Sequence, residues 1–172
     1  SATIAGPINI FGGAVALNSA LSTSNATTGD IAITTTGLTG SGAIALANNR
    51  SLSITQSGTT TYSGVISGTL ASVTKGGAGT LTLSGTNTYT GSTSISEGIL
   101  SIGADANLGT VPGSAAESSI TLSGGTLQST ASMTLNANRG ITMTANSGLA
   151  ATTGSLTYGG IITGGFGITI NG

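Results

Sequence analysis

The sequence predicts an all-β chain wound into a parallel β-helix, a solenoid with three short strands in each coil and essentially no helix. Short runs of alternating apolar and polar residues recur along the chain, and clusters of Gly, Ser, Thr and Asn separate them. No segment places apolar residues at sustained helical spacing. The short strands, the aliphatic inward positions with few aromatic residues, and the similar polar residues at successive corners favour this fold. A two-sheet sandwich is the alternative.

Composition indicates a folded chain and excludes several functions. Hydrophobic residues make up 37% of the 172 residues, too many for a disordered chain, while charged residues make up only 4%. Like residues stack on like residues in a solenoid, which tolerates neutral side chains and penalises repeated charges. The net charge is −1 and the Lys and Arg residues are far apart, so nucleic-acid binding is not expected. No run of about 18 apolar residues is present, so the chain is not expected to insert into a membrane.

The apolar runs give the expected strands in order. Each run ends at a Gly, Ser, Thr or Asn cluster, and Pro7 and Pro112 lie outside the runs, as strands require. In the first third of the chain the runs lie at residues 8–10, 14–17, 31–33, 44–46 and 52–54.

The chain is expected to form one continuous solenoid over residues 1–172. Within it, residues 43–74 and 132–172 form a loose internal repeat. The similarity is clearest between residues 44–54 and 133–143, and between 61–68 and 157–164.

The clearest coil is predicted at residues 75–110. Leucine alternates with threonine in a first strand, a second short strand ends at Ile95, and a third follows Gly98. Gly-rich corners separate these strands, which together are expected to complete one coil. We expect the Thr, Ser and Asn side chains of this stretch outside and its aliphatic side chains inside. The expected inward residues are Leu81, Leu83, Ile95, Leu100 and Ile102.

The same stretch resembles the passenger-associated transport repeat, also called the autotransporter-associated β-strand repeat. Glycines, aliphatic residues, an asparagine and a tyrosine carry the resemblance at matching spacing: Gly77, Gly79, Leu81, Leu83, Gly85, Asn87, Tyr89, Gly91, Ile95, Gly98, Leu100, Ile102, Leu108 and Gly109. The segments around Arg50, Tyr62 and Arg139 resemble those that commonly precede such repeats. The resemblance implies a segment of the passenger of a type V secreted protein from a Gram-negative bacterium.

Passengers of this kind are right-handed parallel β-helices displayed outside the outer membrane. Their transport repeat is associated with efficient passage of the passenger, which folds progressively as it emerges. The resemblance therefore implies a structural stalk or spacer of an adhesin-like surface protein that assists its own export. The expected location is extracellular or at the cell surface, and the expected partners are neighbouring coils of the same protein.

No catalytic, cofactor-binding or metal site is expected, so the chain is not expected to be an enzyme. It has no His and no Cys, which excludes a nucleophilic triad that uses them and any common zinc site. Glu97 and Asp105 are close enough in sequence to suggest a carboxylate pair, but two separate turn residues explain them better. Residues 76–80 resemble a phosphate loop superficially, yet neither the Lys nor the helix of such a loop follows.

Two smaller features have structural interpretations. Lys75 and Glu97 lie about one coil apart, so they are expected to stack as an exposed ion pair worth under ~1 kcal/mol. Tyr62, Tyr89 and Tyr158 each follow Thr and precede Gly by one or two residues. Their rings are expected to pack at corners with the hydroxyls at the rim, and a surface ladder for ligand contact is the alternative.

Two other functions stay open. A binding module would present a face to glycans or a host surface, or a Thr array to ice. The threonines near residues 80–93 motivate it, but an ice-binding face needs Thr-x-Thr at regular coil spacing, and the sequence does not repeat it. The second alternative is a self-assembling extracellular fibre subunit. Uncovered coil ends present unpaired strand edges, so end-to-end self-association is expected.

Overall fold

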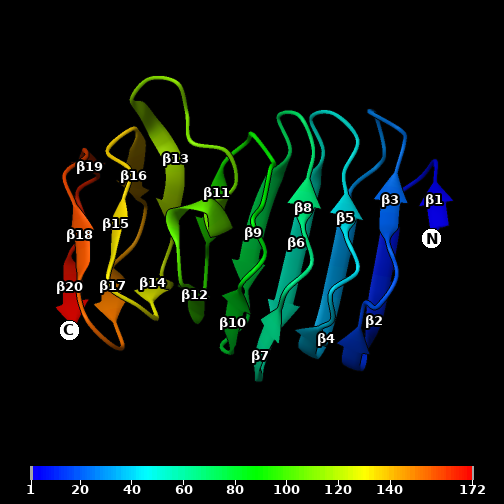
Figure 1. The fold of residues 1–172 in the computed structure, drawn as a ribbon, viewed down its shortest axis with the longest axis horizontal. Helices are drawn as coiled ribbons and strands as arrows, with labels where there is room; N and C mark the ends of the chain where they lie inside the picture. The colour runs from blue at the N-terminus through cyan, green and yellow to red at the C-terminus, as the bar shows by residue number, and fades with distance from the viewer. Residues whose placement is uncertain (1, 172) are drawn as a thin grey trace.

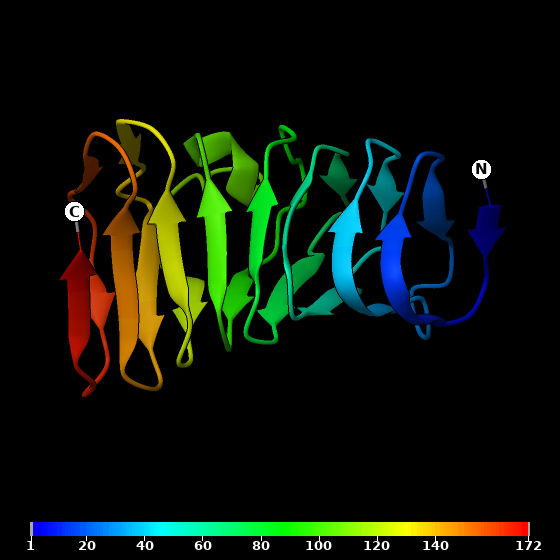
Figure 2. The same ribbon diagram turned by 90° about the horizontal axis from the view of Figure 1, so that it is seen from below.

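The protein is a solenoid of eight stacked coils of parallel strands (Figure 1). The computed structural model describes residues 2–171. The chain advances steadily along one axis, and its two termini lie at opposite ends of the stack (Figures 1 and 2). Every strand pairs in parallel with the equivalent strand of the neighbouring coil, which confirms the predicted all-β solenoid. Each coil has three faces, called here A, B and C in the order the chain visits them.

The B face is one sheet of eight strands that runs the whole length of the solenoid. Its strands are β2 (Ile8–Ala16), β4 (Ile31–Thr39), β6 (Ser51–Gln56), β9 (Ser72–Gly76), β11 (Thr93–Ile95), β13 (Ala116–Leu122), β16 (Arg139–Met143) and β19 (Ile162–Thr163). The first two have nine residues each and merge runs that alternation alone would separate, such as 8–10 and 14–17. They bend around the corner, and Gly40 at the end of β4 forms a bridge with Tyr62 on the C face.

The C face is a sheet of six strands and begins only in the third coil, because β2 and β4 occupy that side before it. Its strands are β7 (Thr59–Tyr62), β10 (Thr80–Leu83), β12 (Ile99–Ile102), β14 (Thr126–Ser129), β17 (Ser147–Ala151) and β20 (Ile168–Asn171).

The A face is the least regular side. It has a four-stranded sheet at one end and a two-stranded sheet at the other. Its strands are β1 (Ala2–Ile4), β3 (Leu21–Thr23), β5 (Ile44–Ala45), β8 (Ile66–Ser67), β15 (Met133–Leu135) and β18 (Leu156–Tyr158). Between β8 and β15 this face is filled by an irregular segment, in which the Thr88 N–H donates to the carbonyl of Ile66, and by a short 3₁₀ helix, η1 (Asp105–Leu108).

Inward side chains stack in columns that form one continuous core. On the B face the column in register runs Ile33, Ile54, Lys75, Ile95, Leu122 and Met143. Each fully buried aliphatic side chain contributes roughly 1.5–3 kcal/mol, so the repeated columns account for much of the stabilisation of the coils.

The stretch 75–110 has the predicted strands, but they do not make a single coil. β10, β11 and β12 lie where alternation places them. However, β12 pairs directly with β10, with Leu100 opposite Leu81. The coil closes after only two strands, because an irregular segment takes the third side. Sequence alternation shows strands and cannot show a side of the coil that lacks one.

The two halves of the internal repeat occupy partly matching places. β5 and β6 lie on the A and B faces, as do β15 and β16. Tyr62 lies at the end of the C-face strand β7, whereas Tyr158 ends the A-face strand β18. Residues 61–68 and 157–164 are therefore similar in sequence but lie on different sides of their coils.

Candidate functional site

The apolar residues of the predicted motif line the interior. Their side chains are at most 1% exposed, and the aromatic ring of Tyr89 is fully buried with them. The residues are Leu81, Leu83, Ile95, Leu100, Ile102 and Leu108. The inward assignment of the five strand residues is confirmed, and Leu108, at the end of η1, fills the same core on the A face.

The motif glycines lie where one coil rests on the next. Gly98 shows this best: its φ is 63°, and a Cβ there would lie 2.5 Å from the carbonyl oxygens of both Gly77 and Gly79. A residue with a side chain would meet main-chain atoms that cannot move aside, and its backbone would be strained as well. The corner is therefore glycine-rich because successive corners nest without side chains between them.

Asn87 and Asn107 point inward, contrary to the expectation that the polar residues of this stretch face solvent. They are 3% and 5% exposed. The Asn87 carboxamide accepts from the Ile66 N–H at 2.8 Å and donates to the carbonyl of Asn107 at 2.6 Å. Asn107 in turn donates to the carbonyl of Gly85 at 2.9 Å and accepts from the N–H groups of Gly103 and Ala104. The two amides thus add side-chain hydrogen bonds to the isolated main-chain bonds that join the A face here, where no strands pair. Thr93 and Ser101 are also buried.

Lys75 does not form the exposed ion pair expected with Glu97. Its side chain is fully buried, and the residue opposite it in register is Ile95. The ammonium donates to the carbonyls of Gly76 at 2.9 Å, Gly77 at 2.7 Å and Glu97 at 3.2 Å. Burial lowers the pKa of Lys75, and the negative charge of Glu97 partly opposes that shift. Side chains alternate along β9, so Lys75 points inward on the same side as Val73, and the register places Ile95 and not Glu97 opposite it.

The tyrosines pack at corners and do not form a surface ladder. Tyr62 and Tyr89 are fully buried, and burial raises the pKa of each to about 12. The hydroxyl of Tyr62 donates to the carbonyl of Gly42, and that of Tyr89 pairs with the Thr93 hydroxyl at 2.6 Å. Tyr158 is half-buried and donates to the carbonyls of Arg139 and Ile161. The packing of the rings at corners is thereby confirmed, but the hydroxyls of Tyr62 and Tyr89 lie in the interior and not at the rim as expected.

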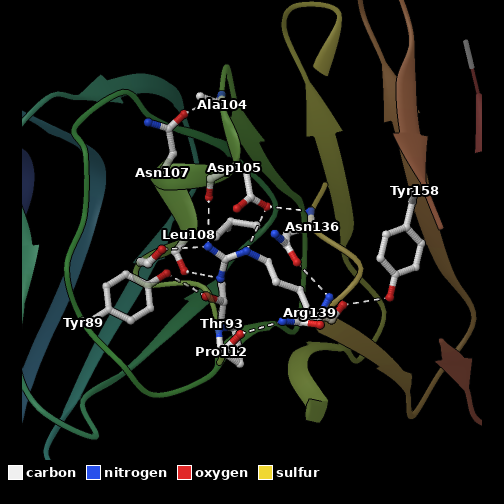
Figure 3. Close-up of polar contacts among 12 residues, drawn as sticks. Tyr89, Thr93, Ala104, Asp105, Asn107, Leu108, Pro112, Asn136, Arg139 and Tyr158 are labelled. Carbon is white, nitrogen blue, oxygen red and sulfur yellow. Dashed lines mark hydrogen bonds and ion pairs between the residues drawn. The ribbon is translucent and has the colours of Figure 1, made fainter. Parts of the chain in front are cut away.

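Arg139 forms an extensive set of polar contacts in the interior, which sequence reasoning missed (Figure 3). It is 2% exposed and its Nε lies 2.9 Å from Asp105 Oδ1. Its other nitrogens donate to the carbonyls of Leu108 at 3.0 Å, Gly109 at 2.7 Å and Asp105 at 3.2 Å. The guanidinium thus satisfies the last carbonyls of η1 and fixes this helix against the next coil. Because charged residues are so rare in this chain, the presence of an arginine could have indicated a specific hydrogen-bonding partner within the fold.

The candidate chemical sites of the sequence are not assembled. Glu97 is exposed at the corner between β11 and β12, whereas Asp105 lies in η1 on the A face and pairs with Arg139. Residues 76–80 turn from β9 into the strand β10, so no helix N-terminus faces a phosphate there. Among residues 2–171, no three His, Cys, Asp or Glu side chains gather as they would around a metal ion. No helix of this part of the chain is long and apolar enough to cross a membrane.

The outer side of the B face carries rows of hydroxyls in register. One row contains Ser53, Thr74, Ser94, Thr121, Thr142 and Thr163. A second row beside it includes Thr34 and Thr55. The sequence does not show this order, because coils of unequal length separate the residues. Strand pairing nevertheless aligns them at the usual distance of about 4.7–4.9 Å between neighbouring strands.

Comparison with known proteins identifies the segment. Residues 73–102 match the family model described as Passenger-associated-transport-repeat. No curated protein and no solved structure matches the chain. The matched residues run from Val73 in β9 to the last residue of β12 and contain the buried lysine, the nested glycines and Asn87. Residues 73–102 are therefore similar to a passenger-associated transport repeat, and in this chain they lie on two successive coils of a parallel β-solenoid.

Proposed function

We propose that the chain is a segment of an autotransporter passenger, exported to the surface of a Gram-negative cell, where it serves as a stalk or spacer. The observation that carries the proposal is the transport repeat built into an uninterrupted solenoid. Like residues stack along the whole length, so the architecture supplies a rigid extended shape. We also propose that the chain has no enzymatic role, since its acids stand apart and it contains no His or Cys.

Export assistance follows from how a solenoid folds. Each coil contacts mainly its neighbours, so folding can begin at one end and propagate as the chain emerges. The contacts of the repeat are of this kind. Asn87 bonds to Ile66 in the coil before it and to Asn107 in the coil after it. We propose that such contacts commit each emerging coil to the stack, which favours onward movement of the chain.

A deletion in register tests this proposal. Val73 lies opposite Thr93, so removal of residues 73–92 takes out one whole coil and leaves the remaining columns aligned. Removal of residues 31–51 is the matched control, because Ile31 lies opposite Leu52. In the exported protein we expect the first deletion to reduce surface display and the control to leave it near the original level. Equal display of both would contradict the proposal, provided that circular dichroism shows both proteins folded.

The hydroxyl rows of the B face favour a second candidate function, a binding face. Their side chains form a regular uncharged surface of the kind that contacts extended polar ligands such as glycans. Several hydroxyls already bond to one another, for example Thr142 to Thr163 at 3.1 Å. A glycan-array screen tests this candidate, with Ser94→Tyr and Thr121→Tyr expected to abolish any binding found. A thermal-hysteresis measurement tests the ice version, and no hysteresis would dismiss it.

A further inference from the structure

The inward side of the B face is aliphatic in almost every coil. Two columns of inward residues run in register along the B-face strands from β2 to β16, and some strands bury a further residue, such as Thr35, Gln56 or Arg139. The pairs in the two columns are Ile8 and Ile10, Ile31 and Ile33, Leu52 and Ile54, Val73 and Lys75, Thr93 and Ile95, Ile120 and Leu122, and Ile141 and Met143. Only two members are polar, Lys75 on β9 and Thr93 on β11. We call the interface between two successive coils a joint. Lys75 and Thr93 lie on the two sides of the joint between β9 and β11, which is inside the segment that matches the transport repeat.

Lys75 depends little on the far side of this joint for its hydrogen bonds. Two of its three acceptors, Gly76 and Gly77, belong to its own corner, and the longest contact, at 3.2 Å, is the one to Glu97 in the next coil. Among the described residues, Asp30 pairs with Arg50 and Asp105 pairs with Arg139. No carboxylate in this part of the chain lies within ion-pair distance of the Lys75 ammonium. When the next coil docks, the Lys75 ammonium loses its contact with water and gains only one further hydrogen-bond acceptor, the carbonyl of Glu97.

We propose that the joint between β9 and β11 is a built-in weak point, at which the solenoid pauses while folding and parts first while opening. A stack that ends at β9 and β10 exposes an ammonium that water solvates well. At the other described joints of the B face the corresponding pair is two aliphatic side chains, or an aliphatic residue with Thr93. Gln56 on β6 is buried beside its pair but is neutral, and the charge of Arg139 on β16 is already bonded to the preceding coil. A partly folded solenoid that ends at this joint is therefore more stable than one that ends at another joint of the B face.

The A face holds the two coils together while the B and C sides yield. Asn87 accepts from the Ile66 N–H across the same joint, with both groups buried. Opening is thus a hinge motion about the asparagine side and not a loss of the whole stack. This inference goes beyond the proposed function, because it concerns the stability of the purified protein. The surface-display experiment neither supports nor contradicts it.

Residue-resolved amide hydrogen exchange tests the proposal. The N–H groups of Ser96 and Ile99 donate across the weak joint, to Lys75 and Gly79. Those of Ser123 and Thr126 make the equivalent bonds across the next joint, to Ile95 and Gly98, and provide the internal control. After correction for intrinsic exchange rates, we expect Ser96 and Ile99 to exchange about tenfold faster than the control pair. Equal protection at the two joints in the original protein would overturn the proposal without any variant.

A substitution identifies the cause. Lys75→Met places in this column a residue type that Met143 already supplies, and we expect it to slow exchange of Ser96 and Ile99 about tenfold, to the rate of the control pair. Ile54→Met is the matched control in the same column and is expected to leave the difference between the joints in place. Faster exchange in Lys75→Met would overturn the proposal, since it would mean that the ammonium strengthens the joint.

Discussion

Single polar side chains inside the solenoid bond mainly to the main chain, either of their own coil or of an adjacent one. Lys75, Asn87, Asn107 and Arg139 all do so from positions with little or no solvent exposure. A buried polar group costs free energy unless it is hydrogen-bonded, so each of these residues is specified by the carbonyls and N–H groups around it. Removal of Asn87, Asn107 or Arg139 leaves several buried main-chain groups unsatisfied, which makes these three positions sensitive to substitution.

Arg139→Met is expected to lower the free energy of unfolding by about 3–5 kcal/mol, since it leaves Asp105 and the carbonyls of Leu108 and Gly109 without their donor. Arg50→Met provides the comparison, because the pair of Arg50 with Asp30 is longer, at 3.5 Å, and more exposed. That change should cost under about 1 kcal/mol. Urea denaturation followed by circular dichroism measures both losses. Similar losses for the two arginines would refute this account of Arg139.

Alkaline pH should destabilise the fold through its buried tyrosines. Tyr62 and Tyr89 have a pKa near 10.0 when unfolded and about 12 when folded. Between these values the unfolded state binds fewer protons than the folded state, so the free energy of unfolding falls as pH rises. The expected slope is about 1.4 kcal/mol per pH unit for each tyrosine.

Urea midpoints measured from pH 9 to 12 give this slope. Tyr89→Phe removes one ionisable group and should reduce the slope above pH 10, even though loss of the contact with Thr93 lowers stability at every pH. An unchanged slope in the variant would show that Tyr89 ionises as readily in the folded protein as in the unfolded chain.

At the scale of elements, the strands of the B and C faces follow from local sequence. The alternation of Leu81 and Leu83 with threonine predicts β10 correctly, because one side of each strand is always core. The A face does not follow in this way. Asn87 looks like a turn residue in the sequence, and only its contacts with Ile66 and Asn107 in adjacent coils turn it inward.

The corners are elements too, and Gly98 allows a direct test. Gly98→Ala is expected to destabilise the protein by about 2 kcal/mol or more, since the left-handed backbone and the nearby carbonyls of Gly77 and Gly79 both oppose a side chain. Gly103→Ala is the control, because the nearest atom to a Cβ there is Thr130 Oγ1 at 3.4 Å. Thermal denaturation compares the two. An equal effect would mean that close stacking of corners is not what requires glycine.

For the whole molecule, the two ends of the stack are complementary. At the C-terminal end, Leu149, Leu156, Tyr158 and Ile170 line a largely apolar hollow of about 370 Å³. The first and last coils carry no charged residue that would oppose edge pairing. Each end also presents a strand or strand segment on all three faces, with parallel edges.

We therefore propose that a protein made of these 172 residues associates head to tail with a second copy, and that such contacts extend into filaments because they do not close. Analytical ultracentrifugation over a range of concentrations should show growing assemblies. Ile170→Lys, which places a charge at the exposed C-terminal edge, should keep the protein monomeric. A monomer at high concentration before any substitution would contradict the proposal.

The sequence by itself determined the parallel solenoid, the strands of residues 80–83, 93–95 and 99–102, and the resemblance to the transport repeat. All of these rest on local alternation, glycine at the corners and motif spacing, which are properties of neighbouring residues. Tertiary structure alone decided which residues share a column. Coils of unequal length bring Lys75 opposite Ile95, align the hydroxyl rows of the B face and bury Arg139 against η1. Register between coils depends on contacts distant in sequence, so alternation along the chain cannot specify it.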